Sequence, residues 1–439
     1  IDFYQRQSYS VQSRFSKEFM MMINRFWLFV CFVAVFAFPS VGGAQNCDVQ
    51  TEAIVKLRSP AFGSYNIWDS VHGAVETHEA FKGAMLLESG HVLAAGHRVN
   101  PDVGVKKTLM LVEIGRNGRV MLEVEHEMPA GADVLKIVPH DKGAMVVANI
   151  VPEKGRAYVW FGVFDLKGAK LSHRTLKGGK ADLTAHDLVR SHSGKSYILA
   201  TSAMIEGGGQ PEWTTLYRLN SKGAVISDHA FKIGADNIMR GLHVMDNGDV
   251  MAAGVIDNAA GRKTGWVMRL NEDLRMIWQQ AYPRGAAAEL VASYPLTKDY
   301  MALAGTALPV DTGNRAGWVM VVGQNSGEVA WQRYFTGELH FDGRDIMVND
   351  DHMISVILDG QTPEGLEVDE HIRLLTINPR GVLFVSDEFF NGQGVDAFGF
   401  MTSANQDRII YGKTVLAHQI EPTDPLDAEG IVAADGETS

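Results

Sequence analysis

The chain has 439 residues, of which 46% are apolar and 21% are charged, a balance typical of a globular protein with a large buried core. This composition excludes a disordered or collagen-like chain, and the length alone would fit about three domains. The net charge of −12, with no long basic block to offset it, argues against nucleic acid as a partner.

The first 44 residues have the pattern of a secretory signal behind an upstream extension. Three consecutive methionines follow residues 1–19, which are therefore expected to be an upstream extension. Arg25 then precedes an apolar run over residues 26–38, and small residues lead to a cleavage site after Ala44. The run is too short to cross a bilayer. We predict a signal peptide over residues 20–44, a secreted or periplasmic protein, and no stable membrane span after cleavage.

Cysteine use fits this prediction without adding a disulfide. Cys31 would leave with the signal, so Cys47 would be the single cysteine of the mature chain. It is expected to be a free or intermolecular thiol, with a lipid anchor as the alternative. The fold would then depend on its hydrophobic core.

An internal repeat organises the rest of the chain. Short apolar segments such as HVLAAG and DVMAAG recur at intervals of 51 to 55 residues and end in a small residue. Each is preceded by a segment of mixed polarity and followed by further strand-like segments with Gly turns, which is the pattern of antiparallel hairpins. The seven repeats end at Gly96, Asn149, Thr201, Gly254, Gly305, Gly360 and Gly412.

Repeated four-stranded meanders predict an all-β fold, a β-propeller, because each sheet can bury its faces only against its neighbours. We expect a single propeller domain over residues 45–439 with seven four-stranded blades. The last repeat lacks an outer strand, and the segment from Thr51 to Ser59 could supply it and close the ring. A ring of six blades with a C-terminal tail is the alternative.

Two segments resemble the PQQ-like (quinoprotein-type) propeller repeat of bacterial secreted propellers, in which a turn with Ser-Gly or Thr-Gly precedes a Trp. These are GQNSGEVAW, which ends at Trp331, and MIW, which ends at Trp278. The resemblance implies either a quinone-dependent dehydrogenase or a non-catalytic scaffold or binding protein. The dehydrogenase branch is expected to carry a disulfide between adjacent cysteines, which this chain does not offer, so no cofactor is predicted.

Ionisable residues near the start of the innermost strands would line the axial channel of such a ring. They would form a polar, mainly acidic funnel that either binds a ligand or is simply wet. Carboxylates there would suit Ca²⁺, but no spacing defines a metal site. Trp68, which has no equivalent in the repeats, is a candidate surface contact. The proposed channel residues are Glu79, Asp133, His186, Arg240, Glu289, Arg344, Asp345 and Asp396.

No residue pattern identifies a catalytic nucleophile, so no catalytic residues are predicted. The sequence favours an exported propeller that binds a protein, peptide or glycan without catalysis. The alternative is a propeller enzyme, a carboxylate-based hydrolase or lyase acting at the axial funnel. The oligomeric state does not follow from the sequence.

Overall fold

A computed structural model describes residues 52–57, 78–99, 107–205, 212–258, 260–309, 313–363, 371–389, 396–402 and 408–413. All of them belong to one compact unit, residues 50–439. The described residues form β-strands and no helix, and none of them builds a helix that could cross a membrane. The predicted signal peptide, the upstream extension, Cys47 and Trp68 lie outside the described residues.

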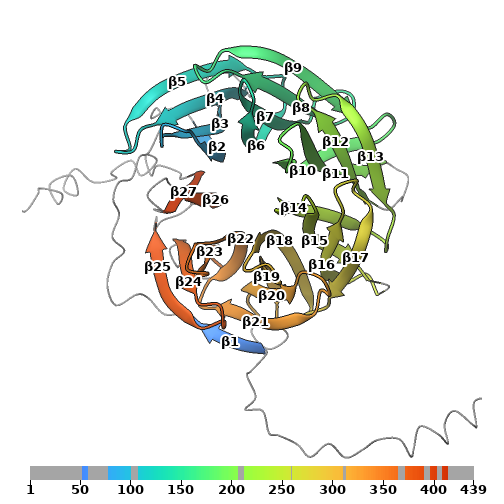
Figure 1. Cartoon of the computed structure of the whole chain (residues 1–439), viewed down its shortest axis with the longest axis vertical. Coiled ribbons are helices and arrows are strands. Elements are labelled where there is room, and N and C mark those ends of the chain that lie inside the picture. The colour runs from blue at the N-terminus through green and yellow to red at the C-terminus, as the bar shows by residue number, and fades with distance from the viewer. Residues whose placement is uncertain are drawn as a thin grey trace, which may run out of the picture. The chain divides into compact units, whose positions relative to one another are not determined.

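The strands form antiparallel meanders arranged around a common axis (Figure 1). The innermost strands are β2 (His78–Leu86), β6 (Ala132–His140), β10 (Asp182–Arg190), β14 (Asn237–Val244), β18 (Ala287–Pro295), β22 (His340–Val348) and β26 (Asp396–Thr402). The second strands are β3 (Val92–Val99), β7 (Gly143–Ile150), β11 (Ser196–Met204), β15 (Val250–Asp257), β19 (Tyr300–Leu308), β23 (Ile354–Gln361) and β27 (Arg408–Lys413).

The third and fourth strands complete six of these sheets. The third strands are β4 (Lys107–Ile114), β8 (Tyr158–Phe164), β12 (Trp213–Asn220), β16 (Lys263–Leu270), β20 (Ala316–Gly323) and β24 (His371–Ile377). The fourth strands are β5 (Val120–Glu127), β9 (Lys170–Lys177), β13 (Val225–Phe231), β17 (Met276–Tyr282), β21 (Val329–Thr336) and β25 (Leu383–Phe389). The β-propeller prediction is therefore confirmed.

The blade count follows the alternative prediction among the described residues. Six sheets have four strands of a meander each, and the seventh repeat contributes the two-stranded sheet of β26 and β27. This small sheet contacts β2 on one side and β22 on the other, so it lies between the last and first four-stranded blades (Figure 1).

The expected closure by an N-terminal strand is wrong. The strand β1 (Glu52–Lys56) pairs in parallel with β21, the outer strand of the fifth blade, instead of joining the last repeat. Val55 and Leu57 pack against the apolar cluster around Phe335 and Phe341. Any outer edge offers unpaired backbone groups to an extended segment, so burial of these two side chains decides which edge is chosen.

The apolar repeats form the core because the second and third strands are covered on both faces by neighbouring blades. The residues of β15 from Val250 to Val255 are all buried, as are those of β20 from Ala316 to Val322. This explains why these strands are continuous apolar runs without alternation. Trp160, Trp266 and Trp318 on the third strands are buried in this core, whereas Trp213 on the third strand β12 is half-buried.

The two Trp motifs join neighbouring blades. The indole of Trp278 donates a hydrogen bond to the carbonyl oxygen of Gln324 at 2.9 Å and packs on Gly327, in the turn of the next blade. Trp331 repeats this contact with Pro379 and Gly381 one blade further on. Both glycines have positive φ, at 72° and 80°, which glycine adopts without strain.

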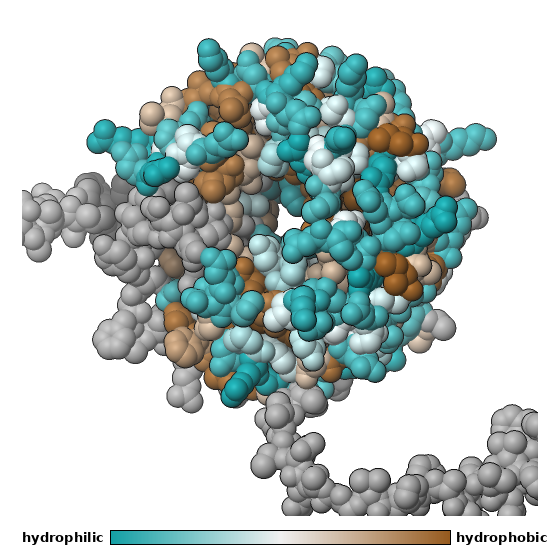
Figure 2. All heavy atoms as spheres, viewed as in Figure 1, coloured by the Kyte–Doolittle hydropathy of each residue, from teal (hydrophilic) through white to brown (hydrophobic). Residues whose placement is uncertain are grey.

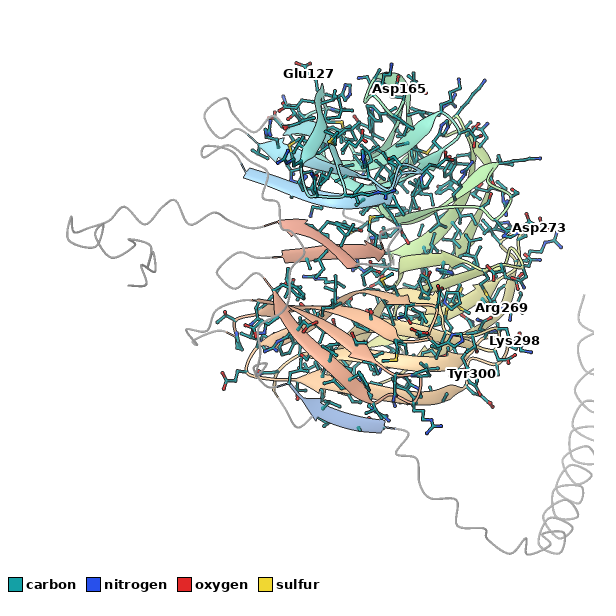
Figure 3. All side chains as sticks on the ribbon, turned by 60° about the vertical axis from the view of Figure 1, so that its left-hand side comes forward. Glu127, Asp165, Arg269, Asp273, Lys298 and Tyr300 are labelled. Atoms are coloured by element: carbon teal, nitrogen blue, oxygen red, sulfur yellow. The ribbon has the colours of Figure 1, made fainter. Side chains whose placement is uncertain are left out.

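Short turns join the first strand to the second and the third to the fourth, and they lie on one face of the ring, which we call the turn face. Asp273, Lys298 and Tyr300 mark two of these turns on the same side (Figure 3). The innermost strands begin at the opposite face and run through the channel toward the turn face.

Candidate functional site

Every innermost strand carries a β-bulge at the same place. The pairing with the second strand skips one residue in each of the seven sheets, which bends the strand and turns the skipped side chain. The skipped residues are Lys82, Leu135, His186, Arg240, Val291, Arg344 and Phe398.

The bulge accounts for the glycine that ends three of the repeated apolar segments. A Cβ atom at Gly254 would overlap the carbonyl oxygen of Ile238, two residues before the bulge. The same close approach occurs at Gly96 and Gly305. Because the bulged backbone presses on this position, glycine is favoured there whatever the channel binds.

Side chains face the channel at three levels along the bulged strands. Before the bulge, buried and half-buried residues alternate, as when Ala288 and Leu290 are buried while Glu289 is half-buried. We define the mouth level as the residue two before the bulge, the bulge level as the skipped residue, and the inner level as the residue after it. Figure 2 shows an opening at the centre of the ring, with hydrophilic residues along much of its edge.

The structure distributes the predicted residues over these levels. Asp133 and Glu289 lie at the mouth level, as does the backbone of Asp396. His186, Arg240 and Arg344 lie at the bulge level and Asp345 at the inner level. Glu79 precedes the bulge of β2 by three residues. The side chains of Glu79 and Asp396 lie outside the described residues.

Acidic and basic residues are separated by level along the innermost strands. The mouth level holds the carboxylates Asp133, Glu289 and Asp342, whereas the bulge level holds Lys82, His186, Arg240 and Arg344 and no acidic residue. Sequence counting placed these groups together at the strand starts, because it did not reveal the bulge that separates them.

Contacts between neighbouring blades confirm that the skipped residues share one level. Nη1 of Arg240 lies 3.4 Å from Nδ1 of His186 in the preceding blade. The ammonium group of Lys82 on β2 lies 3.6 Å from the ring centre of Phe398 on β26, in the two-stranded sheet next to the first blade.

His186 links Arg240 to a carboxylate. Its Nε2 lies 2.7 Å from Oγ of Ser202, whose hydroxyl in turn donates a short hydrogen bond to Glu212. Burial, and secondarily the charge of Arg240, lower the pKa of His186 to about 3, so the imidazole is neutral at physiological pH. Neutral His186 can accept from Arg240 at Nδ1 and donate to Ser202 from Nε2.

Several channel charges are held by ion pairs within the wall. Asp133 lies 3.3 Å from the imidazole of His97 and 3.7 Å from the ammonium of Lys107. Asp342 accepts two hydrogen bonds from the guanidinium of Arg315, at 2.8 and 3.0 Å. These contacts fix the carboxylates in place and neutralise them.

Two further pairs hold the bulged strands together. The guanidinium of Arg344 lies 2.6 Å from the carboxylate of Asp359, which is fully buried. Asp187 forms a short ion pair with Lys136 of the preceding blade and accepts the backbone N–H of Leu242 in the following blade at 2.7 Å. Asp187 thereby connects three blades.

Arg240 and Glu289 differ from these groups, because neither forms an ion pair with any described residue. They lie on the adjacent innermost strands β14 and β18, where Gly241 packs directly on the carbonyl group of Val291. This sector of the channel therefore presents one cation at the bulge level and one anion at the mouth level, both half-buried.

Several residues that contact the charged residues of the innermost strands could not be identified from the sequence. Lys136, Arg315 and Asp359 look like ordinary strand or loop residues, and only their ion pairs with residues of other strands give them a role. Asp342 could have been found, because it is equivalent to Glu289 once the repeats are aligned. Tyr411 lies at the inner level, where burial and the carboxylates of Asp345 and Asp187 raise the pKa of its hydroxyl.

Metal-binding clusters and surface hollows are the other kinds of site that a fold of this type could offer. Within the described residues, no group of three His, Cys, Asp or Glu side chains is arranged to hold a metal ion. A hollow of about 300 Å³ lies at the outer rim, between Gln280–Arg284 and Ser326–Val329, far from the bulged strands. Its lining includes Arg284, whose guanidinium donates to the side chain of Gln332 at 3.0 Å, and Glu328.

Comparisons with known proteins give likeness of fold only. No known family model matches the sequence, and no curated protein matches it. The WD40 domain of Pan2 from Neurospora crassa is 10% identical, with a TM-score of 0.45, covering 76% of this chain and 90% of that domain. A glucose dehydrogenase is 12% identical, with a TM-score of 0.39, covering 69% of this chain and 96% of that one.

A third solved structure of this kind is a putative 6-phosphogluconolactonase from Bacteroides uniformis. It is 16% identical, with a TM-score of 0.43, and covers 76% of this chain and 89% of that protein. These neighbours include both a WD40 domain and enzymes.

Proposed function

We propose that the protein is a binding module that holds part of a protein, peptide or glycan in the mouth of its axial channel, without catalysis. The observation that carries this proposal is the state of the channel wall. Asp133 and Asp342 are neutralised by neighbouring cations, and His186 is held neutral between Arg240 and Ser202. Groups fixed in this way form a binding surface of defined charge rather than a reactive acid–base pair.

The setting of this module is also part of the proposal. The signal pattern over residues 20–44 supports export, so the ligand would be met outside the cytoplasm or in the periplasm. Resemblance to PQQ-like repeats supports the scaffold branch of that family, because Cys47 is the single cysteine after the predicted cleavage site.

The test measures binding and turnover on the same samples. Purified protein is titrated with tripeptides of positive, negative and zero side-chain charge and with maltotriose, cellotriose and chitotriose. Binding is read as a concentration-dependent rise in Tm, and recovered ligand is weighed by mass spectrometry. We expect at least one class to raise Tm and to be recovered intact.

Variants at the mouth separate binding from catalysis. We expect no turnover above the level of buffer alone in the variants Asp133→Asn, Glu289→Gln and Asp396→Asn. Ligand binding by these variants should be weaker than, or equal to, that of the wild-type protein. Cleavage of a ligand by the wild-type protein, lost in these variants, would instead establish the carboxylate-based hydrolase or lyase. Failure of every ligand class to raise Tm would contradict the proposal.

A further inference from the structure

The geometry points to a zwitterionic ligand, one whose carboxylate binds Arg240 and whose ammonium group binds Glu289. This inference rests on the proposed binding function and names the chemistry that the channel selects. It begins from the sector between β14 and β18, where two half-buried charges of opposite sign lack ion-pair partners among the described residues.

Burial makes these two charges unusual. A charge removed from water loses solvation, and proteins ordinarily compensate it with a counter-charge or several hydrogen bonds. At the same levels of this channel, Arg344 is paired with Asp359 and Asp342 with Arg315. A ligand with one carboxylate and one ammonium group would compensate the charges of Arg240 and Glu289. Asp359 and Arg315 do the same for Arg344 and Asp342.

The two charges also lie at different depths and form no ion pair with each other. Glu289 lies at the mouth level and Arg240 at the bulge level, two residues deeper, a difference of about 6.6 Å along a strand. A ligand must therefore span this depth with its cationic end toward the mouth. An inorganic anion or a simple cation would satisfy one group and leave the other unpaired.

The surroundings favour this orientation. Arg240 is backed by neutral His186, which accepts from one guanidinium nitrogen and leaves the other N–H groups for a planar carboxylate. Val291, the skipped residue of β18, lies at the same level as Arg240, and an apolar side chain there suits a hydrocarbon linker between the charged ends. The cation Lys82 at this level adds a favourable potential for an anion.

Two kinds of molecule share this chemistry. One is a free amino acid with a terminal ammonium group, and the other is the C-terminal lysine of a peptide, which carries a carboxylate and an ε-ammonium group. The probes are therefore glycine, 4-aminobutyrate and 6-aminohexanoate, together with the peptide Gly-Gly-Lys as a free acid and as a C-terminal amide.

Calorimetric titration of the whole protein tests the inference, with hexanoate and hexylamine as probes that carry one charge each. We expect 6-aminohexanoate to bind at least tenfold more tightly than hexanoate, hexylamine or glycine. Tighter binding of Gly-Gly-Lys acid than of its amide would identify a peptide terminus as the source. Equal affinity of the two peptides with strong binding of 6-aminohexanoate would identify the free amino acid.

Four variants complete the experiment. Arg240→Gln should reduce 6-aminohexanoate binding to the level of hexylamine, and Glu289→Gln should reduce it to the level of hexanoate. Glu272→Gln and Arg275→Gln, which change exposed residues of one turn-face turn, are the matched controls and should have no effect. If Arg240→Gln does not fold, the inference is tested with Arg240→Lys and by comparing the affinities of the probes for the wild-type protein.

The outcomes separate this inference from the proposed function. Equal affinities for 6-aminohexanoate, hexanoate and hexylamine would overturn the zwitterionic ligand. The zwitterionic ligand would also be overturned if a tripeptide or trisaccharide bound equally well to the wild-type protein, Arg240→Gln and Glu289→Gln. The proposed binding function would still stand in that case. Absence of binding by every probe and every ligand class would overturn both.

Discussion

Two sets of innermost strands differ in how their charges are compensated: β10 and β22, which we call the paired side, and β14 and β18 between them, which we call the unpaired side. On β10 and β22, Asp187 and Arg344 are paired with Lys136 and Asp359, and they hold neighbouring strands together. On β14 and β18, Arg240 lies at the same bulge level as Arg344 and Glu289 lies at the mouth level, and neither forms an ion pair with a described residue. Arg240 and Arg344 occupy the same repeat position, yet only Arg344 has a carboxylate partner in the wall, so the repeat position alone does not determine whether a charge is compensated.

The largest expected effect is on the paired side. Asp187→Ala should lower the free energy of unfolding by about 4 kcal/mol, because it strands the charge of Lys136 and removes the acceptor of the Leu242 N–H. Urea denaturation measures this loss. Lys136→Met keeps the hydrogen bonds that the backbone N–H groups of Leu188 and Leu242 donate to Asp187, at 2.8 and 2.7 Å, and should therefore cost less. A loss below about 1 kcal/mol for Asp187→Ala would contradict this explanation.

Arg344→Gln should have the next largest effect. The substitution leaves the carboxylate of Asp359, which is fully buried, without its guanidinium partner. We expect a loss of about 2 kcal/mol in the free energy of unfolding. The double variant Arg344→Gln with Asp359→Asn should recover part of that loss, and additive losses would show that the pair does not stabilise the ring.

Acid should destabilise the protein through two buried histidines. Burial and Arg240 lower the pKa of His186 to about 3, while burial and Lys136, opposed by Asp246, lower that of His243 to about 4. The unfolded chain binds these protons near pH 6.5 and the folded chain does not. Stability should therefore fall as the pH drops from 6.5 toward 4, by up to about 1.4 kcal/mol per pH unit for each histidine.

His186→Gln tests the share of the first histidine in this slope. Its amide can still accept from Arg240 and donate to Ser202, so the fold is preserved while the titration is removed. Denaturation series between pH 7 and 4 should show a shallower slope in the variant. The same slope in both proteins would mean that other groups cause the acid sensitivity.

The smallest expected effect is on the unpaired side. Arg240→Gln should change the free energy of unfolding by less than about 0.5 kcal/mol, because the substitution removes a charge that no described carboxylate stabilises. Set against Arg344→Gln at the same level of the channel, this variant isolates the contribution of the ion pair. A loss as large as that of Arg344→Gln would remove the distinction between the two sides.

The repeat predicted much of the fold and the sequence could not reveal the rest. The spacing of Gly96, Gly254 and Gly305 and their companions predicts the propeller, since small residues are required where the bulged strand presses on them. The place of β1 depends on where Val55 and Leu57 can be buried. That is a property of the assembled blades, which periodicity does not contain.

The sequence predicts which residues begin the innermost strands, but it does not predict which of them form ion pairs. His186, Arg240 and Arg344 lie on innermost strands, because the start of each repeat marks its innermost strand. Whether a charge is neutralised depends on residues such as Asp359 or Glu212, which approach across strands and turns. The sequence therefore shows the channel charges, and only the structure separates the paired from the unpaired ones.

The most direct test of this distinction is a crystal structure of the protein with 6-aminohexanoate. The account predicts the carboxylate on the guanidinium of Arg240 and the ammonium group on the carboxylate of Glu289, with the pairs Arg344–Asp359 and Lys136–Asp187 unchanged. A ligand bound to Arg344 or Lys136 in place of their wall partners, or bound outside the channel, would contradict it.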